Sequence, residues 1–144
     1  ASDVYKRQAA DRLDASIASA IEAGATALVR GTRDDAHPAL LGPTLLENVP
    51  RDHPLYRDEA FGPVLMVEAA EDFEHAIERA NDSRFGLQCG VFTARMDHAM
   101  RAWDALDVGG VVIGDVPTVR VDRMPYGGVK DSGLGREGPA WAMD

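Results

Sequence analysis

The stretch Asp58-Glu59-Ala60-Phe61-Gly62-Pro63 is followed at once by the apolar run Val64-Leu65-Met66-Val67. A run of this kind predicts a strand buried on both faces, as in a parallel sheet covered by helices. If the chain reaches that strand in extended form, Glu59 and Phe61 project to the same side. A carboxylate accepts hydrogen bonds from two neighbouring hydroxyls, as a ribose offers, and a ring packs against a heterocycle. On spacing alone, an exposed acid beside a core phenylalanine is the better interpretation.

Three sequence blocks, in a consistent order, resemble one known family. Glu59-Ala60-Phe61-Gly62-Pro63 is similar to the Glu-x-Phe-Gly-Pro signature of the aldehyde dehydrogenase superfamily. Residues 124–138, Met-Pro-Tyr-Gly-Gly-Val-Lys-Asp-Ser-Gly-Leu-Gly-Arg-Glu-Gly, resemble its C-terminal Pro-[Phe/Tyr]-Gly-Gly-x-Lys-x-Ser-Gly-x-Gly-Arg-Glu. Between them, Ala80-Asn81-Asp82-Ser83, Phe85-Gly86-Leu87 and Gly90-Val91-Phe92-Thr93 fit the same family. The resemblance runs from Ala9 to the end of the chain and corresponds to about the last third of such an enzyme.

This resemblance implies an activity. It identifies the chain as the C-terminal fragment of an NAD(P)-dependent aldehyde dehydrogenase, which oxidises an aldehyde to a carboxylic acid through a cysteine thiohemiacetal. The nucleophilic cysteine and the general base of the family lie upstream of Ala9, so no catalytic residue is expected in this chain. Glu59 and Phe61 are the implied contacts to the nicotinamide end of NAD or NADP. The most similar members act on small, often oxygenated or semialdehyde substrates, and the implied parent is a homodimer or homotetramer.

The loop 115–124 resembles the segment that borders the aldehyde entrance in the family. By that resemblance Tyr126 forms an aromatic wall near the substrate. Arg120 and Arg123 are the strong cations nearby, and each is a candidate to pair with a carboxylate or phosphate on a substrate. Solvated arginines, or arginines paired with Asp122, are an equally good interpretation.

Composition limits the classes of partner. The chain has 144 residues, one domain's worth, and its 15 basic against 24 acidic residues give a formal net charge of -9. This balance argues against nucleic acid and against anionic membrane surfaces, which both attract Lys and Arg. Neither a signal peptide nor an apolar run of membrane-spanning length is visible. The single cysteine, Cys89, excludes an internal disulfide framework and is compatible with the cytoplasm, so we expect a cytoplasmic protein. A small aldehyde as the substrate is what the family resemblance implies.

Hydrophobic periodicity predicts strands and helices in alternation. Helices are expected over 10–23, after Asp72 with an inner face of Phe73, Ala76, Ile77 and Ala80, and after Asp97 with Met100, Trp103 and Leu106 turned inward. Strands are expected over 25–29, 43–49, 64–69, 88–93 and 111–113, with a helical turn at 53–57, loops over 32–43 and from 116 onward, and a further helix beginning at 139. The predicted fold class is therefore α/β, with a mainly parallel sheet and flanking helices. The resemblance implies that this is the C-terminal part of an aldehyde dehydrogenase catalytic domain.

The opening segment Ala-Ser-Asp-Val-Tyr-Lys-Arg-Gln does not resemble the family at the point where the resemblance of the motifs starts. We expect residues 1–8 to be a foreign leader and residues 9–144 to be a partial catalytic domain, truncated at both ends. A stand-alone, non-catalytic α/β module that binds a partner or oligomerises is the alternative. The acylating and reductive relatives are a third option, against which the block Pro125-Tyr126-Gly127-Gly128 argues.

Several other residues have structural interpretations. Cys89 lies in mid-strand, where a small buried filler is more typical than a nucleophile. The histidines lack metal-ligand spacing, so surface roles are expected and no metal site is predicted for His37, His53, His75 and His98. The glycines between 127 and 138 are expected to permit tight turns and close backbone approach. Lys130 is expected to pair locally with Asp131, and Arg136 with Glu137.

Overall fold

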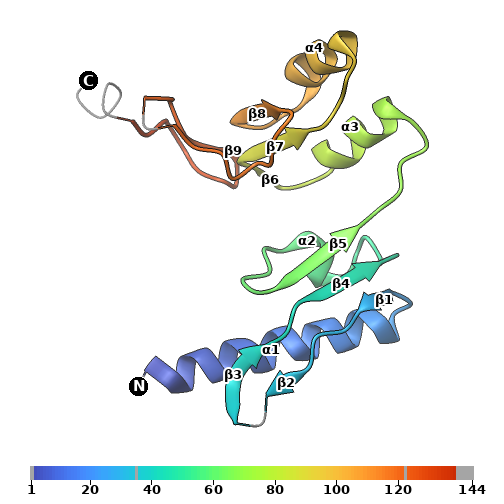
Figure 1. Ribbon diagram of the computed structural model, residues 1–144, viewed down its shortest axis with the longest axis vertical. Coiled ribbons are helices and arrows are strands. Elements are labelled where there is room, and N and C mark those ends of the chain that lie inside the picture. The colour runs from blue at the N-terminus through green and yellow to red at the C-terminus, as the bar shows by residue number, and fades with distance from the viewer. Residues whose placement is uncertain (1, 35, 122, 139–144) are drawn as a thin grey trace. The chain divides into compact units, whose positions relative to one another are not determined.

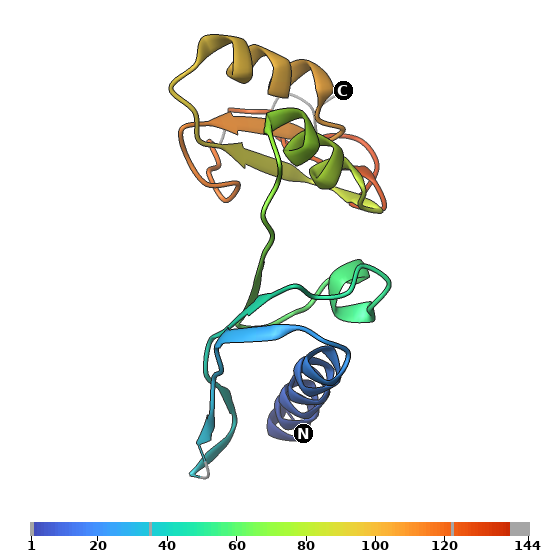
Figure 2. The ribbon, with the colours of Figure 1, turned by 90° about the vertical axis from the view of Figure 1, so that its right-hand side faces the viewer.

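The computed structural model describes residues 2–34, 36–121 and 123–138 (Figures 1 and 2). The chain divides into two compact units, with the boundary between residues 69 and 70. The first unit contains α1 (Ser2–Glu22), β1 (Thr26–Val29), β2 (Arg33–Asp34), β3 (His37–Leu41), β4 (Thr44–Glu47), α2 (Pro54–Arg57) and β5 (Val64–Val67). The second contains α3 (Phe73–Asn81), β6 (Phe85–Gly86), β7 (Gln88–Val91), α4 (Met96–Ala105), β8 (Gly110–Ile113) and β9 (Val129–Lys130).

Helix α1 forms the core of the first unit with one apolar stripe. Leu13, Ile17 and Ala20 follow helical spacing and are buried against Leu46 of β4 and Leu55 of α2. Each fully buried Leu or Ile side chain contributes about 1.5–3 kcal/mol relative to an exposed one. The helix begins at Ser2, well before the predicted start at residue 10, because residues 2–9 contain no glycine or proline to interrupt it.

The predicted stop of this helix is confirmed at Gly24. Its φ of 114° lies in the left-handed region, which favours glycine. The amide of Gly24 donates to the carbonyl of Ile21, and the amide of Ala25 donates to that of Ala20 at 2.9 Å. These bonds satisfy carbonyl groups that the end of the helix leaves open.

The sheet of the first unit has the strand order β1-β4-β5. β1 is antiparallel to β4, and β4 is parallel to β5 with Thr44 opposite Val64. The prediction of a loop over 32–43 is wrong, because β2 and β3 form an antiparallel hairpin there. Asp34 builds its turn by accepting from the amide of Ala36 at 2.9 Å. Strands this short leave no period in the sequence.

Strand β5 is not buried on both faces, so this part of the prediction is wrong for the chain. Leu65 and Val67 are 65% and 43% exposed. β5 lies at one edge of its sheet, and among the described residues no strand pairs with its outer side. The hydrophobic run therefore forms a strand as predicted, but its covering layers are not supplied by residues 2–138.

The second unit packs α3 and α4 on the parallel pair β7–β8. Its core is the cluster of Ile77, Ala102 and Leu106, which the strand residues Cys89 and Val111 contact. The predicted cap of α3 is confirmed, since the Asp72 carboxylate accepts from the amide of His75 at 2.8 Å. Ile77 is buried as predicted, whereas Ala80, expected on the inner face, is exposed.

Helix α4 differs from the prediction in its cap and its buried stripe. Its N-cap is Arg95, whose guanidinium Nε donates to the Asp97 carboxylate at 3.0 Å. Leu106 is buried as predicted, but Met100 and Trp103 are 54% and 67% exposed. The small Ala102 faces the core in their place, at four residues from Leu106, and permits close helix–sheet contact.

The fold class is mixed α/β, and the predicted mainly parallel sheet is confirmed only in part. β4–β5 and β7–β8 are parallel, but β1–β4, β2–β3 and β6–β9 are antiparallel and every sheet is small. The helix expected from residue 139 lies outside the described residues. None of the described helices has both the length and the apolarity needed to cross a membrane.

Candidate functional site

The segment that carries Glu59 and Phe61 is fixed at both ends. It follows α2, whose C-cap Asp58 donates its amide to the carbonyl of Pro54 at 2.8 Å. It enters β5 through a tight turn in which the amide of Val64 donates to the carbonyl of Gly62 at 2.8 Å. These two bonds hold the backbone of the segment at both of its ends.

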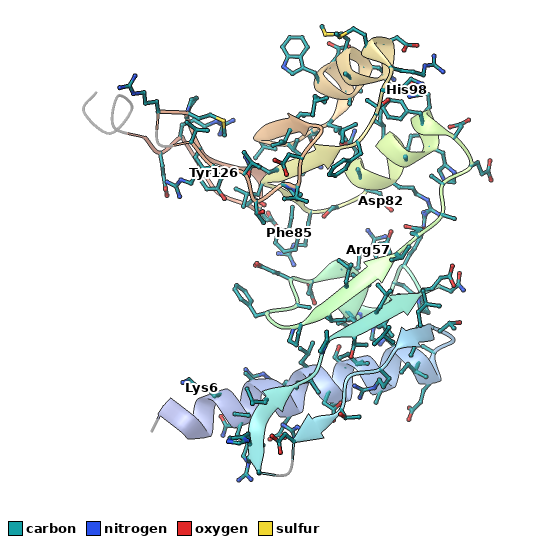
Figure 3. All side chains as sticks on the ribbon, in the orientation of Figure 1. Lys6, Arg57, Asp82, Phe85, His98 and Tyr126 are labelled. Carbon is teal, nitrogen blue, oxygen red and sulfur yellow. The ribbon has the colours of Figure 1, made fainter. Side chains whose placement is uncertain are left out.

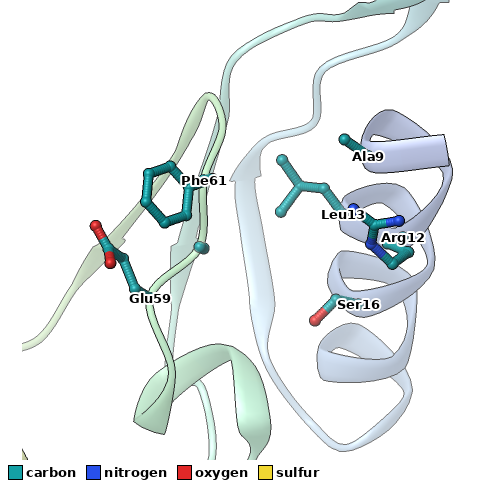
Figure 4. A pocket seen from close by; sticks show the side chains of 7 residues that line it. Ala9, Arg12, Leu13, Ser16, Glu59 and Phe61 are labelled. Carbon is teal, nitrogen blue, oxygen red and sulfur yellow. The ribbon is translucent and has the colours of Figure 1, made fainter. Parts of the chain in front are cut away.

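Glu59 and Phe61 both face solvent. Figure 4 shows the carboxylate and the ring on the same side of the segment, as an extended approach to β5 predicts. Phe61 is 84% exposed, so the alternative that it is a core phenylalanine is wrong.

A cavity of about 260 Å³ lies between this segment and α1. Its lining combines helix and segment residues: Ala9, Arg12, Leu13, Ser16, Glu59, Ala60 and Phe61 (Figure 4). The Glu59 carboxylate and the Phe61 ring lie on the face of the segment turned away from α1 (Figure 4), and on that face they offer an acceptor for hydroxyl groups and a flat surface for a heterocycle. These two groups suit the ribose and heterocycle end of a dinucleotide only.

In the second unit, the C-terminal block folds back onto the middle block. β9 pairs with β6 in an antiparallel ladder, with Phe85 opposite Lys130. Lys130, at a φ of 54°, points its ammonium at the C-terminal end of α3 and donates to the carbonyls of Asn81 and Ser83, both at 3.1 Å. A cation at this end of a helix is stabilising. The predicted local pair of Lys130 with Asp131 is therefore wrong, and Asp131 instead accepts from Arg84 Nε at 2.6 Å.

Asn81 and Ser132 complete this attachment. The Asn81 amide donates to the carbonyl of Ala105 at 2.8 Å and accepts from the amide of Asp107 at 2.8 Å, which joins the ends of α3 and α4. The Ser132 hydroxyl accepts from the amide of Gly86 at 2.9 Å. The polar residues of the middle and C-terminal blocks thus hold the loop 126–137 in place.

Tyr126 lies at the centre of a small cluster in that loop (Tyr126 is labelled in Figure 3). Its amide donates to the carbonyl of Glu137 at 2.9 Å, and the amide of Glu137 donates back at 2.6 Å. The Arg120 guanidinium lies over the Tyr126 ring at 4.6 Å, and its Nη2 is 3.7 Å from Glu137 Oε2. The structure therefore brings two of the predicted residues, Arg120 and Tyr126, together.

Two further expectations in this loop have different outcomes. Arg136 does not pair with Glu137, because its Nη1 donates to the carbonyls of Gly128 at 3.0 Å and Gly135 at 2.9 Å. Arg123 is exposed, and it makes no ion pair with another residue that the structure describes. Pairing with Asp122 lies outside the described residues.

The glycines of the loop serve close backbone approach, as expected. A Cβ atom on Gly127 would lie 2.4 Å from the carbonyl oxygen of Gly135. Any side chain at this position would push the two strands of the loop apart. The glycines therefore shape the loop, and no phosphate cradle needs to be invoked.

Cys89 and the histidines have structural environments. Cys89 packs against the second core, and its burial raises the pKa of the thiol above the ordinary value, which disfavours the nucleophilic thiolate. His53 caps α2, and His98 stacks on Phe73 at 4.0 Å between ring centroids. His98 is thus packed against α3 instead of lying on a purely polar face (Figure 3). Within residues 2–138, apart from 35 and 122, no three His, Cys, Asp or Glu side chains gather as a metal site would require.

A family model described as the aldehyde dehydrogenase family matches residues 3–144. The chain belongs to the aldehyde dehydrogenase family. The segment with Glu59 and Phe61 and the loop with Tyr126 are therefore parts of an aldehyde dehydrogenase fold, as the sequence blocks predict.

Known aldehyde dehydrogenases match this chain over part of their length. The 3-sulfolactaldehyde dehydrogenase of Priestia aryabhattai is 41% identical over 135 residues, which are 94% of this chain and 28% of that protein. A solved aldehyde dehydrogenase of Physcomitrella patens, in complex with the reaction product succinate, matches with a TM-score of 0.90 at 38% identity, over 96% of this chain and 28% of that chain. The glyceraldehyde-3-phosphate dehydrogenase of Methanocaldococcus jannaschii, complexed with NADP, matches with a TM-score of 0.87 at 39% identity, over 96% and 29% of the two chains. This aldehyde dehydrogenase chain thus spans less than a third of the relatives it matches.

Sequence reasoning missed Glu137 and Arg12 of this aldehyde dehydrogenase chain. The sequence predicts an ion pair of Glu137 with its neighbour Arg136, although the fold places the Glu137 carboxylate beside Arg120. Its place in the Gly-Arg-Glu end of the family block was the available signal. Arg12 lines the cavity at Glu59 from α1, and no feature of its helix marks it in the sequence.

Proposed function

We propose that this chain supplies the nicotinamide-side and aldehyde-side surfaces of an NAD(P)-dependent aldehyde dehydrogenase. The observation that carries the proposal is the pair of solvent-facing Glu59 and Phe61 on a segment fixed at both ends. The parent enzyme oxidises an aldehyde to a carboxylic acid through a thiohemiacetal on a cysteine, and both that cysteine and the general base belong to the part of the enzyme outside this chain. When bound, NAD or NADP supplies the acceptor for the hydride.

In this proposal each residue has a binding role. The Glu59 carboxylate accepts hydrogen bonds from the hydroxyls of the nicotinamide ribose, and Phe61 packs near the ring. Tyr126 forms one wall of the aldehyde site, and the attachment of its loop through Lys130 keeps that wall in place. Relatives support the choice of cofactor, because the Methanocaldococcus jannaschii enzyme is complexed with NADP.

The aldehyde proposed for the parent carries an anionic group. Arg120 provides a cation in the Tyr126 cluster, and Arg123 is a second, exposed cation in the same loop. Two relatives are named for anionic aldehydes, sulfolactaldehyde and glyceraldehyde-3-phosphate, and a third is described in complex with its anionic product succinate. Sulfonate, phosphate and carboxylate groups all suit the fork of a guanidinium.

The test of the cofactor assignment is Glu59→Gln in the complete enzyme. A neutral amide accepts a weaker bond from a ribose hydroxyl, and loss of a charge-assisted hydrogen bond costs about 1.5–3 kcal/mol. This corresponds to a loss of roughly ten- to hundredfold in the step that uses the cofactor. Steady-state kinetics with varied cofactor measures it, with Asp52→Asn as the matched acid-to-amide control. Unchanged KM and kcat for the cofactor in Glu59→Gln would contradict the assignment.

A non-catalytic α/β module remains the second candidate, and one observation favours it. Met100 and Trp103 of α4 and Leu65 of β5 leave large apolar side chains exposed. Such surfaces are typical of protein–protein contact. The two candidates differ in activity, because only the parent enzyme turns over an aldehyde.

A further inference from the structure

Arg120 is held in the Tyr126 cluster by two partners of different kinds. Below it lies the Tyr126 ring, at 4.6 Å from the guanidinium carbon to the centroid, which attracts a cation. Beside it lies the Glu137 carboxylate, 3.7 Å from Arg120 Nη2. The backbones of the two partners are joined by reciprocal hydrogen bonds of 2.9 and 2.6 Å, which keep both side chains near Arg120.

The contact between Arg120 and Glu137 is looser than most of the other arginine–carboxylate contacts. At 3.7 Å it exceeds hydrogen-bond distance, as does the 3.6 Å contact of Arg51 with Glu68, whereas Arg84 Nε lies 2.6 Å from Asp131. The Arg120 and Glu137 side chains are 54% and 75% exposed. An ion pair with this separation and exposure is weak, so a better anion can displace the carboxylate.

Glu137 has no other cation to neutralise it among the residues that the structure describes. Arg136, its neighbour in sequence, donates to the carbonyls of Gly128 and Gly135 and does not pair with the Glu137 carboxylate. Among the described residues, the carboxylate of Glu137 is therefore paired with Arg120 alone.

We infer that Glu137 sets the charge selectivity of the aldehyde site, as an internal counter-ion that an anionic substrate must displace from Arg120. This inference rests on the proposed function, in which Arg120 borders the aldehyde site. An aldehyde with a carboxylate, sulfonate or phosphate competes with Glu137 for one guanidinium, and a bidentate fit gives the substrate the advantage. A neutral aldehyde leaves the Arg120–Glu137 pair intact. Glu137 is thus a specificity-determining residue, because it raises the KM for anionic aldehydes and leaves the KM for neutral aldehydes unchanged.

The test compares two aldehydes of equal length in the complete enzyme, succinic semialdehyde and butanal. The measured quantity is the ratio of their kcat/KM values. Glu137→Gln removes the competing charge and is expected to raise this ratio about two- to fivefold, the range of an exposed ion pair, through a lower KM for succinic semialdehyde. Glu137→Asp keeps the charge and should retain most of the original ratio. Glu78→Gln, an exposed acid on α3, is the control for a general change of charge.

A second background separates the inference from the proposed function. In Arg120→Met the ratio should fall, and adding Glu137→Gln should then change it no further. If Arg120→Met lowers the ratio but Glu137→Gln leaves it unchanged, lowers it, or slows both aldehydes equally, the role of Glu137 is wrong and that of Arg120 stands. If Arg120→Met itself leaves the ratio unchanged, Arg120 does not border the aldehyde site, and the proposed use of that residue fails first. Roughly 0.5 M salt should shrink the effect of Glu137→Gln, because it screens an exposed charge.

Discussion

At the scale of single residues, Cys89 shows how an environment excludes a chemistry. Its thiol lies against Ile77, Ala102 and Leu106, and burial raises its pKa above the ordinary value. Because the thiolate is the reactive form, we predict that Cys89 in the folded chain reacts severalfold more slowly with Ellman's reagent at pH 8 than it does in urea. Rates measured across alkaline pH should show a later rise for the folded chain. Equal rates in both states would mean that the thiol is accessible and that its pKa is not raised in the folded chain.

The candidate site could be predicted in part at this scale. The common direction of Glu59 and Phe61 follows from the alternation of an extended chain, and Figure 4 shows it. The partner of Glu137 could not be predicted from spacing, since it depends on the loop folding back so that residue 137 meets residue 126. That contact turns Arg136 to backbone carbonyls and leaves Glu137 to Arg120.

At the scale of elements, the first turn of α4 contains a titrating ion pair. The Arg95 guanidinium, hydrogen-bonded to Asp97, lowers the pKa of that carboxyl to about 2. Since the folded pKa lies below the unfolded one, the pair stabilises α4 above the unfolded pKa, and its contribution is lost as the pH falls from about 4 toward about 2. We predict a carboxyl-carbon NMR titration of Asp97 with its midpoint near 2. Arg95→Gln should move the midpoint upward, and an unmoved midpoint would show that Arg95 is not the cause.

The attachment of β9 to α3 gives a second prediction for an element. Lys130 is 21% exposed at its side chain and donates to Asn81 and Ser83, so Lys130→Met removes a charged donor from helix-end carbonyls. Hydrogen bonds to charged groups contribute about 1.5–3 kcal/mol, and the smaller value suits a partly exposed group. Amide hydrogen exchange of Gly86 and Asp131, which donate across this attachment, should become faster by about tenfold. Lys6→Met, at an exposed lysine of α1, is the matched control, and protection equal to that control would contradict the role of Lys130.

Element types were predictable where one apolar face meets one core, and α3 with its Asp72 cap is the example. The buried stripe of α4 was not, because α4 has two apolar faces and the larger residues lie on the exposed one. Ala102 contacts the core, while Met100 and Trp103 do not. Hydrophobic periodicity gives most weight to large side chains, and it therefore predicts that the face with Met100 and Trp103 is buried instead of the face with Ala102.

At the scale of the whole molecule, the apolar surfaces that α4 and β5 leave exposed are consistent with the small share of its relatives that the chain covers. A helix that is apolar on two faces is typical of a buried helix, and an apolar edge strand such as β5 is typical of a sheet that continues. The chain spans 28% of the Priestia aryabhattai enzyme and 28% of the Physcomitrella patens chain. The prediction that residues 1–8 are a foreign leader stays a prediction, although α1 already begins at Ser2.

The chain by itself is therefore predicted to lack aldehyde dehydrogenase activity. A hydride-transfer site of this kind needs a thiolate nucleophile, a base for deacylation and contacts along the whole dinucleotide. This chain offers the nicotinamide-end residues Glu59 and Phe61, while its one cysteine is packed against a core with a raised pKa. The measurement is absorbance of the reduced nicotinamide with NAD or NADP and a panel of short aldehydes, beside a Cys89→Ser variant. Light scattering should show association that grows with concentration, because Leu65 and Trp103 are exposed. Cofactor reduction that requires aldehyde and disappears in Cys89→Ser would overturn the structural role of Cys89 and the binding-only role of this chain together.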